Sequence, residues 1–236
     1  MDGLARVAPV ARPLLSDVDS ALLTLGAPAS HPVWDLLRAT GVTPGDAVSF
    51  FADLAPQALR ATAAQLRARA EDYLQTTLPT SVGWEGAAAE HSAATLAALR
   101  RHLVGDGVTG DDPASLAGRL RATASSVERM ADWQQRWRDE MAAILARVIT
   151  SRQAVLVRSH PGLGAGLAEA TRSADGVATA VRAAADIGAA LLAVADDALA
   201  AGRDLLAGAG AELVELDYRA PEVSGPAPYG GPIRVH

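Results

Sequence analysis

The sequence predicts an all-helical protein, and two observations support this prediction. Alanine, the strongest helix former, supplies 53 of the 236 residues, whereas valine and isoleucine are few and do not alternate with polar residues. Leucine and alanine recur every three or four residues over long stretches, which is the spacing of one helical face. We expect an elongated antiparallel bundle built from two helical hairpins, with a small helical cap at the N-terminus.

The predicted cap covers residues 1–42. A short helix is expected over Ser16–Leu25, with two acidic residues in its first turn, and a second helix over Val33–Ala39. Trp34 follows the last proline of the connection, and we expect its ring to pin the cap onto the bundle. The connection consists of residues that interrupt helices, namely Gly26, Pro28 and Pro32.

The first hairpin is predicted within residues 43–110. Its first helix is expected from Pro56, a first-turn proline, to about Leu78, and its second from Glu85 to about Val104. Because the connection is short, the two helices are expected to pack antiparallel. Their apolar stripes consist of Leu59, Ala63, Leu66, Ala70 and Leu74 in the first helix, and of Leu96, Leu99 and Leu103 in the second.

The second hairpin is predicted within residues 111–217. The pair Asp112-Pro113 predicts a helix start, and an apolar stripe runs from there without a break to Val157. Such a helix would be about 67 Å long at ~1.5 Å per residue. A turn from His160 to Gly164 then precedes a second long helix. Its glycines are expected where it crosses another helix closely: Gly176, Gly188, Gly202 and Gly208.

Residues 218–236 are rich in proline and glycine, and we expect a flexible tail. No segment has the pattern of a secretory leader, since residues 1–13 contain two arginines and two prolines. The most apolar helix is interrupted by charges, so its uncharged stretch Ile187–Ala195 falls far short of the ~20 residues that span a membrane. We therefore expect no cleaved leader and no membrane span.

The composition of the chain argues against several classes of function. The net charge is −6 with both signs spread along the chain, which argues against a nucleic-acid surface. The chain has no cysteine, so disulfides and thiolate metal sites are excluded. Neither lysine nor asparagine occurs, which is typical of a very GC-rich genome because both residues need AT-rich codons. The five histidines lack metal-ligand spacing and no motif gathers catalytic groups, so we expect no metal, no cofactor and no enzymatic activity.

The tripeptide Trp84-Glu85-Gly86 stands between the two helices of the first hairpin. Glycine can take a positive φ, and tryptophan buries a large flat surface, so together they can lock a helical corner or offer a ring to a partner. In this position the tripeptide resembles the corner of the WXG-type proteins of type VII secretion. The chain's length and second hairpin resemble their extended actinobacterial relatives.

The resemblance implies a helical protein that associates with a WXG-type partner or with itself. It also implies docking on an export machinery without a cleaved leader. The protein would be cytoplasmic before export, and secreted or associated with the cell envelope afterwards.

The same resemblance implies a Tyr-x-x-x-Asp/Glu export signal after the helix opposite the corner. Tyr218 and Glu222 fit the letters, but they follow the second hairpin and enclose Pro221. His102 and Asp106 lie at the expected place after the W-x-G helix, with histidine in place of tyrosine. Both candidates stay open.

Two further questions stay open in the sequence. Trp133 and Trp137 lie four residues apart on one helical face, where they form either a contact surface or, as we favour, part of a core with few other aromatics. Two functions compete with export: a cytoplasmic helical scaffold or adaptor, and a chaperone or targeting module of a toxin.

Overall fold

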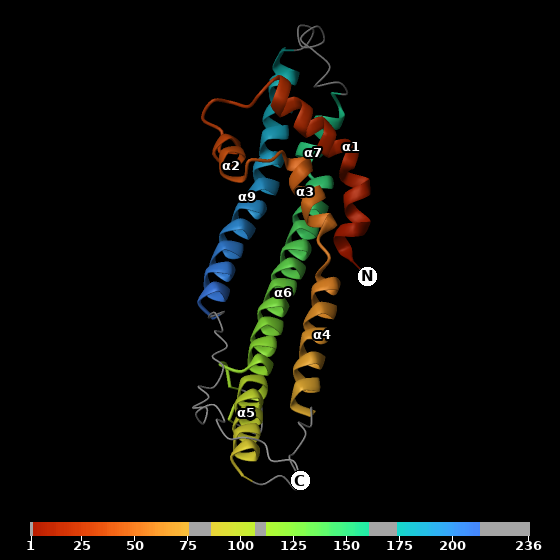
Figure 1. The fold of residues 1–236 in the computed structure, drawn as a ribbon. Coiled ribbons are helices and arrows are strands. Elements are labelled where there is room, and N and C mark those ends of the chain that lie inside the picture. The colour runs from red at the N-terminus through yellow and green to blue at the C-terminus, as the bar shows by residue number, and fades with distance from the viewer. Residues whose placement is uncertain (1, 76–85, 107–111, 161–173, 213–236) are drawn as a thin grey trace, which may run out of the picture. The chain divides into compact units, whose positions relative to one another are not determined.

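The computed structural model describes residues 2–75, 86–106, 112–160 and 174–212. Helices occupy most of these residues and none of them lies in a strand, so the all-helical prediction is confirmed (Figure 1). The chain divides into two compact units. Unit 1 contains Met1–Arg60 and Val127–Gly210, and unit 2 contains Ala61–Ser126 and Ala211–His236.

The first helix, α1 (Gly3–Thr24), is longer than the predicted Ser16–Leu25. That prediction was wrong because Pro9 and Pro13 both lie inside the helix and both are exposed, so neither ring disturbs the packing. Asp2 caps the helix by accepting hydrogen bonds from the backbone amides of the first turn. Burial of one face stabilises it, through Leu4, Ala11, Leu14, Leu15, Val18, Ala21 and Leu22.

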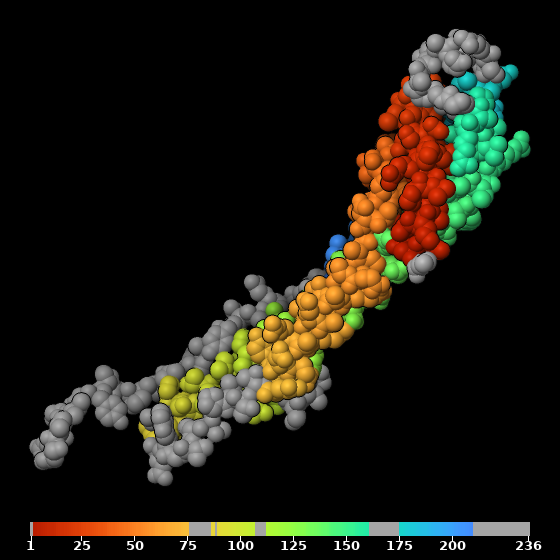
Figure 2. All heavy atoms as spheres, turned by 90° about the vertical axis from the view of Figure 1, so that its right-hand side faces the viewer, coloured from red at the N-terminus to blue at the C-terminus, as the bar shows by residue number. Residues whose placement is uncertain are grey.

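Two short helices follow in unit 1. The helix α2 (Val33–Thr40) confirms the predicted Val33–Ala39, and the Trp34 indole donates to the carbonyl of Pro28 at 3.1 Å. The helix α3 (Pro44–Asp53) begins with proline after Thr43, whose hydroxyl oxygen accepts the amide of Asp46. In Figure 2 the atoms of α1 lie beside those of α3 on one side and those of α7 (Arg152–Arg158) on the other.

The helices α4 (Pro56–Gln75) and α5 (Ala87–Val104) agree with the predicted helices of the first hairpin. The next helix, α6 (Leu116–Ile149), begins three residues later than the Asp112-Pro113 pair predicts. Ser115 is fully buried and accepts the amide of Gly118 at 3.0 Å, so this serine takes the capping role. Asp112 accepts the amide of Ala114 and shapes the preceding turn.

The predicted unbroken helix to Val157 is wrong, because the chain leaves the helix between α6 and α7. The Thr150 hydroxyl donates to the carbonyls of Ala146 and Arg147, which satisfies acceptors at the end of α6. Ser151 is extended (ψ 159°), and its hydroxyl oxygen accepts the amide of Ala154 to start α7. Two adjacent hydroxyl residues thus end one helix and begin another within a continuous apolar stripe.

The last described helix, α9 (Ala174–Glu212), contributes the largest share of the unit 1 core. Trp133 of α6 donates its indole N–H to the carbonyl of Ala198 at 3.1 Å, while Ile144 and Ile187 line one cavity further along. The two helices therefore run antiparallel within unit 1 (Figure 1). Among the large apolar residues of α9, Ile187 and Leu191 are buried, whereas Leu199 is exposed.

Gly188 marks the closest crossing of α9. A Cβ there would lie 3.0 Å from Leu22, 3.2 Å from Pro44 and 3.4 Å from Val33, so three other helices approach the same point. Gly202 likewise lies against the Trp133 ring, but Gly208 has nothing within 4 Å. The expectation that glycines mark close crossings therefore holds at two of these three positions.

By length and composition alone, Asp175–Ala209 of α9 could cross a membrane, and it is one such helix among the described residues. This is weak evidence, because the core helix of a folded domain satisfies the same criteria. Leu191 and Leu192 are fully buried in the unit 1 core. The absence of a membrane span stays a prediction.

Arg138 of α6 is the most deeply buried charged residue that the structure describes, with 4% of its surface exposed. Its Nη1 donates to the carbonyls of Phe51, Ala52 and Leu54 at 2.5–2.8 Å, which lie at the C-terminal end of α3. Its Nη2 donates to the carboxylate of Asp2, the N-cap of α1. One guanidinium thus joins three helices.

Replacing Arg138 with methionine should lower the free energy of unfolding by about 3–5 kcal/mol. The substitution fills a similar volume but leaves three carbonyls and one carboxylate without their donor. Urea unfolding followed by circular dichroism measures the effect. Arg203→Met, at an exposed arginine of α9, is the matched control and should change stability by less than about 0.5 kcal/mol. Equal effects of the two substitutions would contradict this role.

Gly188→Leu should destabilise the protein by about 1–3 kcal/mol or more, because the new side chain overpacks a crossing that already lacks room for a Cβ. Gly208→Leu provides the control in the same helix, where the new side chain meets open space. The two variants are compared by thermal and urea unfolding. A Gly188→Leu variant as stable as the control would show that the crossing is loose.

Candidate functional site

The backbone at the W-x-G tripeptide requires glycine. Gly86 has φ 92° and ψ −176°, a conformation that is essentially restricted to glycine, and it is the N-cap of α5. Its carbonyl accepts the amides of Ala89 and Glu90, so the first turn of α5 closes directly on it. Trp84 lies outside the described residues. The sequence therefore predicted correctly that the glycine of the tripeptide takes a positive φ.

Unit 2, which contains Gly86, has a small core in its described part. Its buried apolar residues are alanines apart from Val104. The leucines of the predicted stripes keep part of their surface exposed, and none is fully buried. These leucines are Leu66, Leu74, Leu96, Leu99 and Leu103, together with Leu116 and Leu120 of α6.

The two candidate export signals differ in what the structure describes. Tyr218 and Glu222 lie outside the described residues. His102 lies half-buried in the last turn of α5, and Gly105 ends that helix before Asp106. Asp106 accepts the Arg101 guanidinium Nε at 2.7 Å, so this carboxylate is already paired within its own segment.

Trp133 and Trp137 both belong to the unit 1 core. Trp137 is 7% exposed, and the guanidinium of Arg136 lies 5.2 Å from its ring centre. Trp133 packs against the core and bonds to Ala198 of α9. Their placement favours the packing interpretation over an aromatic contact surface.

The described residues contain no group of three or more histidine, cysteine, aspartate or glutamate side chains that could hold a metal ion. His31 instead contacts α9, with its Nε2 3.0 Å from a carboxylate oxygen of Asp186. The backbone amide of Val33 donates to Nδ1 of His31, so the proton of the neutral ring lies on Nε2. This contact holds the segment before α2 against α9.

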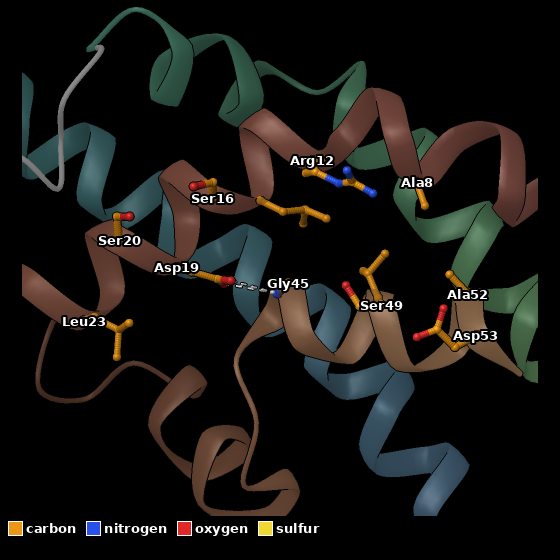
Figure 3. Close-up of a pocket in the computed structure, with 12 residues that line it drawn as sticks. Ala8, Arg12, Ser16, Asp19, Ser20, Leu23, Gly45, Ser49, Ala52 and Asp53 are labelled. Carbon is orange, nitrogen blue, oxygen red and sulfur yellow. Dashed lines mark hydrogen bonds between the residues drawn. The ribbon is translucent and has the colours of Figure 1, made fainter.

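A groove of about 510 Å³ runs between α1 and α3 of unit 1 (Figure 3). Its lining includes the buried residues Leu15 and Val48. Sequence reasoning missed this site, because α3 received no role and the first half of α1 was not expected to be helical. The remaining lining residues are Ala8, Arg12, Ser16, Asp19, Ser20 and Leu23 of α1 and Gly45, Ser49, Ala52 and Asp53 of α3.

Asp19 is the half-buried carboxylate of this groove. It accepts the Thr43 hydroxyl at 3.0 Å and the amide of Gly45 at 3.1 Å, so it binds the N-terminal end of α3. Burial raises the pKa of Asp19 above its ordinary value, and the nearby charge of Asp46 adds to this. The hydrogen bonds from Gly45 and Thr43 lower the pKa but do not outweigh burial.

Comparisons of this chain with family models, with curated proteins and with solved structures find no match.

Asp19→Asn should lower the free energy of unfolding relative to the unmodified protein, and this loss should become smaller as the pH rises. Because the pKa of Asp19 is raised in the folded state, its contribution to the free energy of unfolding is present below the ordinary aspartate pKa. That contribution is lost as the pH rises through the folded-state pKa, and asparagine does not titrate. Urea unfolding from about pH 3.5 to about pH 7 measures the difference.

Asp17→Asn, on the same helix but outside the groove lining, controls for the loss of one carboxylate from α1. A deficit of the Asp19 variant that stays constant or grows with pH would contradict the assigned sign.

Proposed function

We propose that this protein is a non-enzymatic type VII secretion substrate, or a secretion-associated partner protein, which acts through helical contacts. The observation that supports the proposal best is Gly86. It adopts a glycine-only conformation at the W-x-G position and starts a helix there. If the three residues stood together only because the chain is rich in glycine and alanine, this glycine would not need a conformation that other residues avoid.

The burial in unit 2 supports a role in protein contacts. Its described core consists mainly of alanines, and a buried alanine removes much less apolar surface from water than a buried leucine. The partly buried leucines of α4 and α5 retain some surface that a partner helix can cover. In this proposal α4 and α5 pack antiparallel as the first of two hairpins, and the corner between them docks on the export machinery.

Two other functions use the same helices. A cytoplasmic scaffold would also present these partly buried leucines, and a toxin chaperone or targeting module would present them to one dedicated partner. Retention in the cell, in a strain with a working type VII system, would favour the scaffold. A toxin gene beside this one would favour the third function.

Gly86→Ala and Trp84→Ala should each lower the secreted fraction at least about fivefold. An alanine at φ 92° is strained by about 1–3 kcal/mol, which disturbs the start of α5. Secretion is measured by immunoblotting the medium and the cells of an actinobacterial host with a working type VII system. Partner binding is measured by co-purification from the same cells.

Gly208→Ala is the matched control, because Gly208 lies inside a helix with nothing within 4 Å of the added Cβ. This control should be secreted like the unmodified protein. The proposal loses its main support if both corner variants leave secretion and partner binding unchanged.

A further inference from the structure

The groove between α1 and α3 carries an alternating charge pattern. Figure 3 shows Asp53 towards one end, Arg12 in the middle and Asp19 towards the other end. Along α1, Arg12 and Asp19 are seven residues apart, which is ~10.5 Å in a helix. Asp53 lies on the Ala8 side of Arg12 in Figure 3. The groove therefore presents negative, positive and negative charge in that order.

Small residues leave room in the groove for another helix. On α1 they stand four residues apart at Ser16 and Ser20, and on α3 at Gly45 and Ser49. Such rows form a shallow channel into which the side-chain ridge of a further helix can pack. At one end Leu23 is 76% exposed, so apolar surface is also available there.

One exposed face of α6 carries the complementary pattern. Arg136 is followed by Glu140 four residues later, and Glu140 by Arg147 after seven more. All three residues are exposed, and the small, exposed Ala143 lies between the last two on the same face. The order of positive, negative and positive charge along α6 is therefore the opposite of the order in the groove.

We propose that the α1–α3 groove binds the exposed face of α6 from a second copy of this chain. Arg136 would then face Asp53, Glu140 would face Arg12, and Arg147 would face Asp19. The second α6 would run parallel to α1. This self-association is independent of the proposed role in secretion, since it uses only residues of unit 1.

The charges concerned are not used in ion pairs among the described residues, and the Arg136 guanidinium lies against the Trp137 ring. Within the described part of the chain, neither Arg12 and Asp53 of the groove nor the three charged residues of α6 form an ion pair. Asp19 accepts hydrogen bonds only from neutral donors, and burial raises its pKa. A facing guanidinium would favour the charged form of this carboxylate.

Sedimentation velocity on the full chain, over a concentration series up to about 1 mM, tests the proposal. The unmodified protein should associate as its concentration rises, and salt should weaken the association. Asp53→Arg and Arg136→Asp should each weaken it about tenfold, because like charges then face each other. The double variant D53R/R136D should restore association to within about threefold, since the pair is rebuilt with reversed signs.

A second pair, R12E and E140R, repeats the test at the centre of the groove and serves if one of the first variants fails to fold. Asp197→Arg, an exposed acid of α9 outside both surfaces, should leave association unchanged. Three outcomes would overturn the proposal. The unmodified protein could remain monomeric throughout, the single reversals could have no effect, or the double variants could fail to recover association.

Discussion

The arrangement of unit 1 depends on the contacts of Arg138. The last carbonyls of a helix have no partner inside that helix, and at the C-terminal end of α3 three of them point to one guanidinium. The same group also binds Asp2, which caps α1. The pKa of Asp2 is lowered: burial works against the charged form, but the Arg138 contact and the capping amides outweigh it. Helix ends, rather than helix faces alone, therefore fix these elements.

A second carboxylate on α1 acts at the other end of α3. Asp19 accepts the amide of Gly45 in the first turn of α3, while Arg138 satisfies its last carbonyls. Both ends of this ten-residue helix are thus held by side chains from neighbouring helices. A helix this short is marginal alone in water, so tertiary contacts at its ends and at Phe51 stabilise it. The groove beside Asp19 exists because the seam between α1 and α3 is lined by small residues.

The sequence predicted the features that local patterns specify, namely helices with an apolar face and the residues that begin or end them. Helices starting at Pro56 and Val33, and the special glycine of the W-x-G tripeptide, followed from such local signals. The helical start of α1 did not, because Pro9 and Pro13 lie inside that helix, where proline is usually unfavourable. The break at Ser151 was hidden by an apolar stripe that continues across it. Neither the groove nor the contacts of Arg138 could be predicted, because they join residues from separate helices through tertiary packing.

The two units differ in how fully they satisfy their own apolar surface. Unit 1 buries leucine, isoleucine, phenylalanine and methionine side chains in one core, whereas the described part of unit 2 buries mainly alanine. Since stabilisation scales with the apolar area removed from water, the alanine core of unit 2 contributes less per residue than the core of unit 1. Unit 1 offers a different chemistry, a groove with alternating charges that sets specificity and register more than affinity. A chain with both kinds of surface can therefore bind two partners by different physical means, and variants of one surface need not affect the other.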